Sequence, residues 1–148
     1  MEQYTISTLI QLILKDYNLP VSFDIEPVLK KYENEKNKNY DAISKLQNII
    51  PDEIKIKIKD VIEDKKIDAF EIIKLINIIK DLINFFDKNK NFLKDHVYDY
   101  LDILLTVLFN EFNVFKSVEA NNAMADLIIS CLKTNFTVNL LTSLICCK

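Results

Sequence analysis

The sequence predicts an all-α protein: a compact bundle of seven to eight helices in one domain spanning residues 1–148. Glycine is absent. Tight β-turns depend on glycine, whereas asparagine can take its place in the left-handed conformation at helix ends. Apolar residues also recur every three or four positions along most of the chain, which is helical spacing. The length of 148 residues is usual for a single domain.

The first part of the chain contains three segments with helical signals. The first has an apolar series at helical spacing: Ile6, Leu9, Ile10, Ile13 and Leu14. Pro20 ends this helix. Asp24 can cap a second helix that has Pro27 in its first turn. A polar loop over 34–39 then leads to a short third helix over about 41–49.

Residues 54–59 alternate isoleucine and lysine, which is typical of a strand when read alone. With one further turn included, the apolar positions follow helical spacing: Ile54, Ile58, Val61 and Ile62. We favour a helix because the chain contains no second strand to pair with this one. The strand remains the open alternative at residues 54–58.

Asp68 and Glu71 have the spacing of a capping box, with aspartate in place of serine or threonine. They begin a strong helix that runs to Phe86 and is followed by a loop over 87–91.

Three helices are predicted in the last third of the chain. The first covers residues 92–113. Ser117 caps the second, which runs to about Lys133, and the third covers Phe136 to Cys146. The inward positions of the first are apolar: Val97, Leu101, Leu104, Leu105, Leu108 and Phe112.

Composition excludes several classes of function. Without glycine there is no phosphate-binding loop, dinucleotide fingerprint or nucleophile elbow. All 19 basic residues are lysine and the net charge is −3. Because there is no arginine and no basic face, we expect no nucleic-acid binding.

One segment has partial similarity in spacing to a calcium-binding loop. Its acidic positions would be Asp60, Asp64, Asp68 and Glu71. It lacks an oxygen ligand at Ile62, and Lys65 occupies the position where the sharp turn needs glycine. A turn between two helices is the better interpretation, and we expect no bound metal or other cofactor.

The single histidine, His96, lies near Asp95, Asp99 and Asp102. Structural zinc sites use cysteine or several histidines, so a solvated helix surface is favoured here. Cys131 is expected to be a small buried residue, since one histidine cannot be placed beside it from the sequence. We therefore predict no catalytic residues and no enzyme activity.

The cysteine pattern and the apolar segments suggest a compartment. The cysteines are odd in number, and two of them, Cys146 and Cys147, are adjacent, which is no disulfide framework. The first residues do not have the pattern of a signal peptide. Charged and polar residues interrupt each apolar segment, so no transmembrane segment is expected. These features predict an intracellular protein, in the cytoplasm or within a virus particle, that is not secreted.

The final predicted helix is apolar on nearly all sides and carries a candidate protein interface: Phe136, Leu140, Leu141, Leu144 and Ile145. A helix of this kind is buried, either in the core of the bundle or against another chain. The sequence leaves both possibilities open.

These observations predict a non-enzymatic structural or assembly protein that acts through contacts with a protein partner or with itself. The excess of isoleucine, lysine and asparagine is what AT-rich codons produce, which points to an AT-rich source such as a large DNA virus, a phage or an AT-rich microbe. With the apolar C-terminal segment, it suggests a minor component of a virus or phage particle. The alternative is a helical groove-type interaction module, a Bcl-2-like viral modulator of host signalling or cell death. Size, helix count and the apolar helix over 97–112 suit that alternative, but the glycine and tryptophan of that family's signature are absent. A small enzyme or a calcium-binding protein is the third interpretation.

Overall fold

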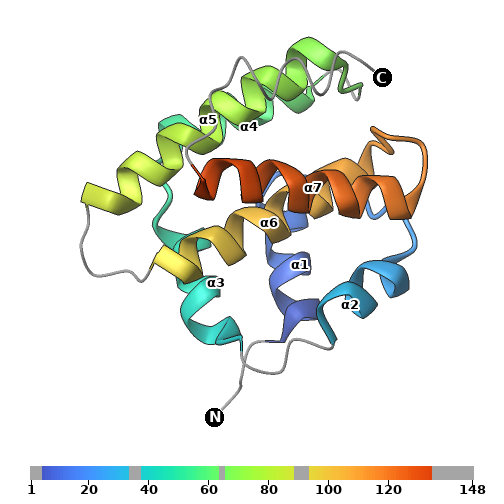
Figure 1. The fold of residues 1–148 in the computed structure, drawn as a ribbon, viewed down its shortest axis with the longest axis horizontal. Coiled ribbons are helices and arrows are strands. Elements are labelled where there is room, and N and C mark those ends of the chain that lie inside the picture. The colour runs from blue at the N-terminus through green and yellow to red at the C-terminus, as the bar shows by residue number, and fades with distance from the viewer. Residues whose placement is uncertain (1–4, 34–37, 64–65, 89–93, 135–148) are drawn as a thin grey trace.

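The computed structural model describes residues 5–33, 38–63, 66–88 and 94–134. Within these ranges 80% of the residues are helical and none forms a strand (Figure 1). The all-α prediction is confirmed, and the expected final helix over 136–146 lies outside the described residues. The helices are α1 (Ile6–Asp16), α2 (Ile25–Glu33), α3 (Tyr40–Ile49), α4 (Asp52–Ile62), α5 (Ala69–Lys88), α6 (Lys94–Glu111) and α7 (Val118–Lys133).

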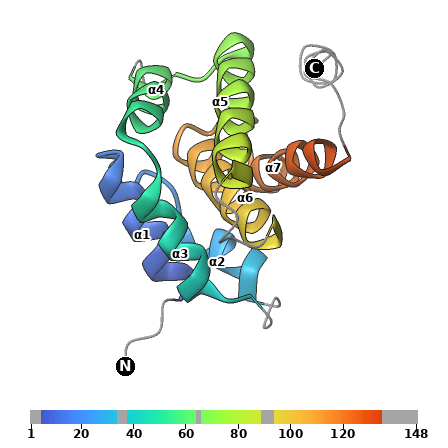
Figure 2. The same ribbon diagram turned by 90° about the vertical axis from the view of Figure 1, so that its left-hand side faces the viewer.

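Helix α6 is the central helix of the described part. Every side chain from Ile103 to Glu111 is buried, so this helix is enclosed on all sides. It packs most extensively against α7 and also contacts α1, α3 and α5. Figure 2 shows α1 and α3 on one side of α6 and α7 on the other. All seven helices contribute buried apolar side chains to one continuous core.

Residues 54–58 are helical, as favoured from the sequence. They belong to α4, which buries the four apolar positions that helical spacing indicated, and leaves Ile56 56% exposed. Helix α5 lies beside α4 and packs against it. Packing on one helical face therefore decides the conformation of a segment whose local pattern alternates.

Most helix ends lie where the sequence predicted them. Asp24 accepts a hydrogen bond from the Glu26 backbone N–H at 3.1 Å, and Ser117 accepts one from Ala120 at 3.1 Å. Asn18, two residues after the end of α1, has φ 53°, the left-handed conformation that glycine commonly takes at this position.

The connection between α6 and α7 is held by buried asparagines that the sequence did not indicate. Asn121 is 1% exposed, and its side-chain oxygen accepts the Phe115 backbone N–H at 2.8 Å. Its amide group donates to Asn110 at 3.4 Å and to Asn113 at 3.2 Å. These bonds fix the turn that places α7 against the central helix.

Among the described helices, none combines the length and the apolar character needed to cross a membrane.

Candidate functional site

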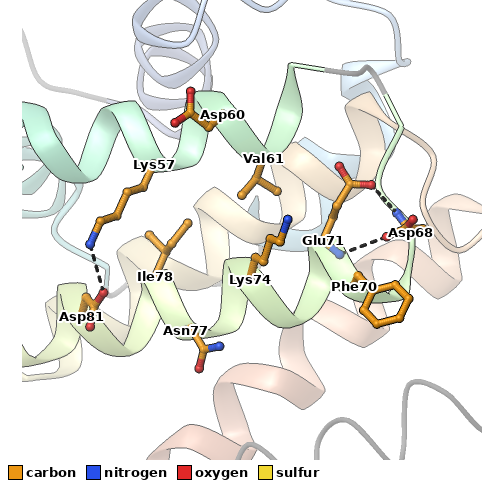
Figure 3. A pocket seen from close by; sticks show the side chains of 10 residues that line it. All are labelled: Lys57, Asp60, Val61, Asp68, Phe70, Glu71, Lys74, Asn77, Ile78 and Asp81. Carbon is orange, nitrogen blue, oxygen red and sulfur yellow. Dashed lines mark hydrogen bonds and ion pairs between the residues drawn. The ribbon is translucent and has the colours of Figure 1, made fainter.

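A groove between α4 and α5 is the main candidate site (Figure 3). The two helices lie side by side, and the cavity between them has a volume of about 630 Å³. Apolar and charged side chains line it together: Lys57, Asp60, Val61, Asp68, Phe70, Glu71, Lys74, Asn77, Ile78 and Asp81. A mixed surface of this kind suits binding to another polypeptide, because it offers both apolar area and charges that fix orientation.

The predicted capping box at one end of this groove is confirmed. The Asp68 backbone N–H donates to Glu71 Oε1 at 3.2 Å, and the Glu71 N–H donates to Asp68 Oδ1 at 3.0 Å. Both carboxylates therefore hold the start of α5. Figure 3 shows Asp60 projecting from α4 away from this pair. Asp64, another acidic position of the calcium-like loop, lies outside the described residues.

The most exposed large apolar side chain among the described residues lines the groove. Phe70 lies in the first turn of α5 and is 76% exposed. Further along the groove, Lys57 on α4 faces Asp81 on α5 at 3.8 Å, and more than half of each side chain is exposed. Such an exposed ion pair contributes little to stability, so both groups can interact with a partner.

A second cluster, of polar side chains that are mostly buried except for the exposed Asp126, joins α2, α6 and α7. The Lys31 ammonium group lies 3.3 Å from Asp102 and 3.0 Å from Asp126. It also donates to the Thr106 hydroxyl at 2.8 Å. The Tyr32 hydroxyl lies within hydrogen-bond distance of Thr106 and Asp102, at 3.0 and 3.3 Å. We call these five residues the Lys31 cluster.

Burial dominates the electrostatics of the Lys31 cluster. Burial, together with the neighbouring Asp126, raises the pKa of Asp102 to about 7 against the lowering effect of Lys31. Burial also raises the pKa of Tyr32 well above its ordinary value. The available sequence signal for this cluster was Thr106, which follows Asp102 by four residues and is the one polar residue among positions 103–109.

A third group of polar side chains, connected by hydrogen bonds and an ion pair, links α1, α3, α4 and α6. The Tyr100 hydroxyl donates to Gln47 Oε1, and Gln47 Nε2 donates to Asp16 at 2.7 Å. Asp16 in turn lies 3.5 Å from the Lys55 ammonium group. Gln47 and Tyr100 are both fully buried, so these bonds satisfy groups that would otherwise be costly inside the core.

The acids near His96 are used in part for ion pairs. Asp99 binds Lys38 at 2.7 Å and Asp102 binds Lys31, while His96 itself is half-buried. The described residues hold no group of three or more histidine, cysteine or carboxylate side chains arranged for a metal ion. The lysines that pair with these acids come from the segments around α2 and before α3, so local spacing gave no indication of them.

The remaining predicted site residues divide into two groups. Cys131 is a buried free thiol on α7, as expected. The candidate interface residues Phe136, Leu140, Leu141, Leu144 and Ile145 lie outside the described residues, as do Cys146 and Cys147.

Comparison with protein-family models, with curated proteins and with solved structures finds no match to this chain.

Proposed function

We propose that this protein is a non-enzymatic structural or assembly protein that acts through protein–protein contacts. The observation that carries the proposal is the surface position of Phe70, which is 76% exposed where the groove between α4 and α5 begins. Burying one phenylalanine or leucine side chain stabilises a contact by roughly 1.5–3 kcal/mol. A partner that covers this ring therefore gains a substantial part of its binding free energy from one residue.

Two further features support contact with another chain. Ile56 on α4 is 56% exposed, so the helix pair presents a second apolar side chain. The C-terminal sequence adds the apolar residues named above, from Phe136 to Ile145, with no charged residue between them. Large exposed apolar patches are characteristic of chains that associate.

The described polar groups support binding rather than catalysis. In the Lys31 cluster the ammonium group and the carboxylates bind each other, and the Asp68 and Glu71 carboxylates hold a helix start. A catalytic site instead needs a nucleophile or base with reach to a substrate. We propose an intracellular setting for the protein, as a minor component of a virus or phage particle. The excess of isoleucine, lysine and asparagine, which AT-rich codons produce, supports this proposal.

A helical groove-type interaction module, Bcl-2-like in its mode of action, is the second candidate. The observation that favours it is the groove itself, a cavity of about 630 Å³ beside a bundle built around the apolar helix α6. The two candidates differ in solution mass. An assembly protein forms oligomers as its concentration rises, whereas a groove-type module is a stable monomer until its target peptide is added.

Sedimentation velocity over a hundredfold range of concentration tests the assembly proposal. We expect the wild-type chain to associate, and we expect Phe70→Lys and Leu141→Lys to weaken association while circular dichroism stays helical. Val21→Lys is the matched control, because Val21 is 58% exposed and does not line the groove. A wild-type chain that stays monomeric throughout would contradict self-assembly and favour the groove-type module. Global unfolding of Leu141→Lys would place that residue in the core.

A further inference from the structure

A second cavity, of about 680 Å³, lies where the ends of α1, α4 and α6 meet. Asn18 and Asn113, which follow α1 and α6, line it and have φ values of 53° and 47°. These left-handed residues turn the chain, and the segment after α1 then lies against the end of α6. The volume falls within the range of roughly 300–1,000 Å³ typical of pockets for small organic molecules.

The wall of this cavity contains a buried carboxylate. Glu111, the last residue of α6, is 9% exposed, and its two oxygens accept the Ser22 backbone N–H at 3.2 and 3.0 Å. Across the described ranges no lysine ammonium lies within 4 Å of it. A carboxylate has acceptor sites for about four hydrogen bonds, so one N–H leaves most of them open. A buried charge without a cation is costly and favours binding of a cationic group.

The rest of the wall is suited to an apolar body. Leu19, Ile62 and Phe112 contribute apolar side chains around the carboxylate. Lys59 and Glu63 also line the cavity, and both are exposed. The site therefore combines one buried carboxylate and these apolar side chains with exposed polar residues: Asn18, Ser22, Lys59, Asp60, Glu63 and Asn113. Apolar surface with a few placed polar groups is the usual composition of a pocket that orients a ligand.

We propose that this cavity binds a small organic cation, an ammonium or guanidinium group carried on an aliphatic stem. The cationic group binds the Glu111 carboxylate, and the stem packs against Leu19, Ile62 and Phe112. This inference is independent of the proposed assembly function, because the cavity lies at the helix ends and shares only Asp60 with the groove between α4 and α5.

The test compares hexylamine, which is cationic at pH 7, with hexanol, which has the same stem and no charge. Binding is followed by calorimetry and by chemical-shift changes of the Leu19 and Ile62 methyl groups. We expect hexylamine to bind at least tenfold more tightly than hexanol. Glu111→Gln keeps the shape of the side chain and an oxygen that accepts the Ser22 N–H. It should reduce the ratio of the affinities for hexylamine and hexanol to near one. Glu53→Gln is the matched control: it changes the net charge equally but removes an exposed carboxylate of α4 that does not line the cavity, and should retain the preference.

Two results would overturn the proposal: equal affinity of the wild-type chain for the two probes, or an unchanged preference in Glu111→Gln. If Glu111→Gln fails to fold, the affinities of the wild-type chain for hexylamine and hexanol are sufficient to test the proposal. A lysine side chain from another protein has the same chemistry as a free amine, and competition distinguishes the two sources. Displacement of hexylamine by a lysine-containing peptide, but not by its norleucine counterpart, assigns the site to a protein partner. Displacement by free diamines alone assigns it to a small molecule.

Discussion

The ammonium group of Lys31 lies 3.3 Å from the carboxylate of Asp102, and only 12% and 13% of the two side chains is exposed. This ion pair ties α2 to the central helix α6. Although a cation lies so close, burial and, to a smaller extent, Asp126 raise the pKa of Asp102 to about 7. The cost of removing the charge from water thus exceeds the attraction of one lysine that Asp102 and Asp126 share.

The first prediction concerns pH. The folded protein binds the Asp102 proton more tightly than the unfolded chain does, because the pKa is about 7 in the folded state and 3.8 is the ordinary value. The stabilising contribution is therefore fully present below about pH 4 and is lost as the pH rises through about 7. We expect Asp102→Asn to flatten the dependence of the free energy of unfolding on pH between pH 5 and 8, measured by urea denaturation.

Asp81→Asn is the control for this experiment, since Asp81 also pairs with a lysine but is 53% exposed. It should leave the pH dependence as it is in the wild-type chain. If Asp102→Asn and the wild-type chain show the same slope over this range, then Asp102 is not the group that titrates.

The second prediction concerns Lys31. Lys31→Met removes the cation from two carboxylates, and removal of one partner from a buried pair costs about 3–5 kcal/mol. The loss should be larger at pH 8 than at pH 5, because a protonated Asp102 needs no counter-charge. Lys57→Met, which removes one partner of an exposed pair at 3.8 Å, should cost less than about 1 kcal/mol. Equal losses in the two variants would contradict the importance of burial.

The helices of the described part could be predicted largely from local signals. Asp24, Ser117 and the Asp68–Glu71 pair are capping residues whose chemistry acts within one turn. Residues 54–58 alternate like a strand when read alone, but the spacing that continues through Val61 and Ile62 favoured the helix, and α4 is that helix, packed beside α5. Signals that act within a few residues were thus sufficient for most helix boundaries.

The polar clusters could not be predicted because their members are distant in sequence. Lys31 and Asp102 are 71 residues apart, and Ser22 and Glu111 are 89 apart. No local rule pairs them, and their contact depends on how α2 and the segment after α1 pack against α6. A polar residue within the apolar run of α6, such as Thr106 or Asn110, was the available signal that a buried polar partner exists.

The third prediction tests the chain of polar contacts between α3 and α6. Tyr100→Phe removes the hydroxyl that donates to Gln47 and leaves a buried amide oxygen without that donor. We expect a loss of about 1–3 kcal/mol in the free energy of unfolding. Tyr98→Phe is the matched control, because Tyr98 is half-buried on the same helix. Its loss should be within about 0.5 kcal/mol. An unchanged free energy of unfolding in Tyr100→Phe would indicate that Gln47 finds another donor.

The last prediction follows from the absence of glycine. Lys116, in the turn before α7, has φ 73°, a conformation that costs a residue with a Cβ atom roughly 1–2 kcal/mol. Glycine removes that strain but adds about 0.4–1 kcal/mol of unfolded-state entropy to be lost on folding. We therefore expect Lys116→Gly to stabilise the protein by about 0.5–1 kcal/mol, measured by thermal and urea denaturation. Asn18→Gly, at φ 53°, should change stability less, because asparagine tolerates the left-handed conformation better than lysine does. A destabilised Lys116→Gly variant would show that lysine at this position is held by contacts worth more than the backbone strain.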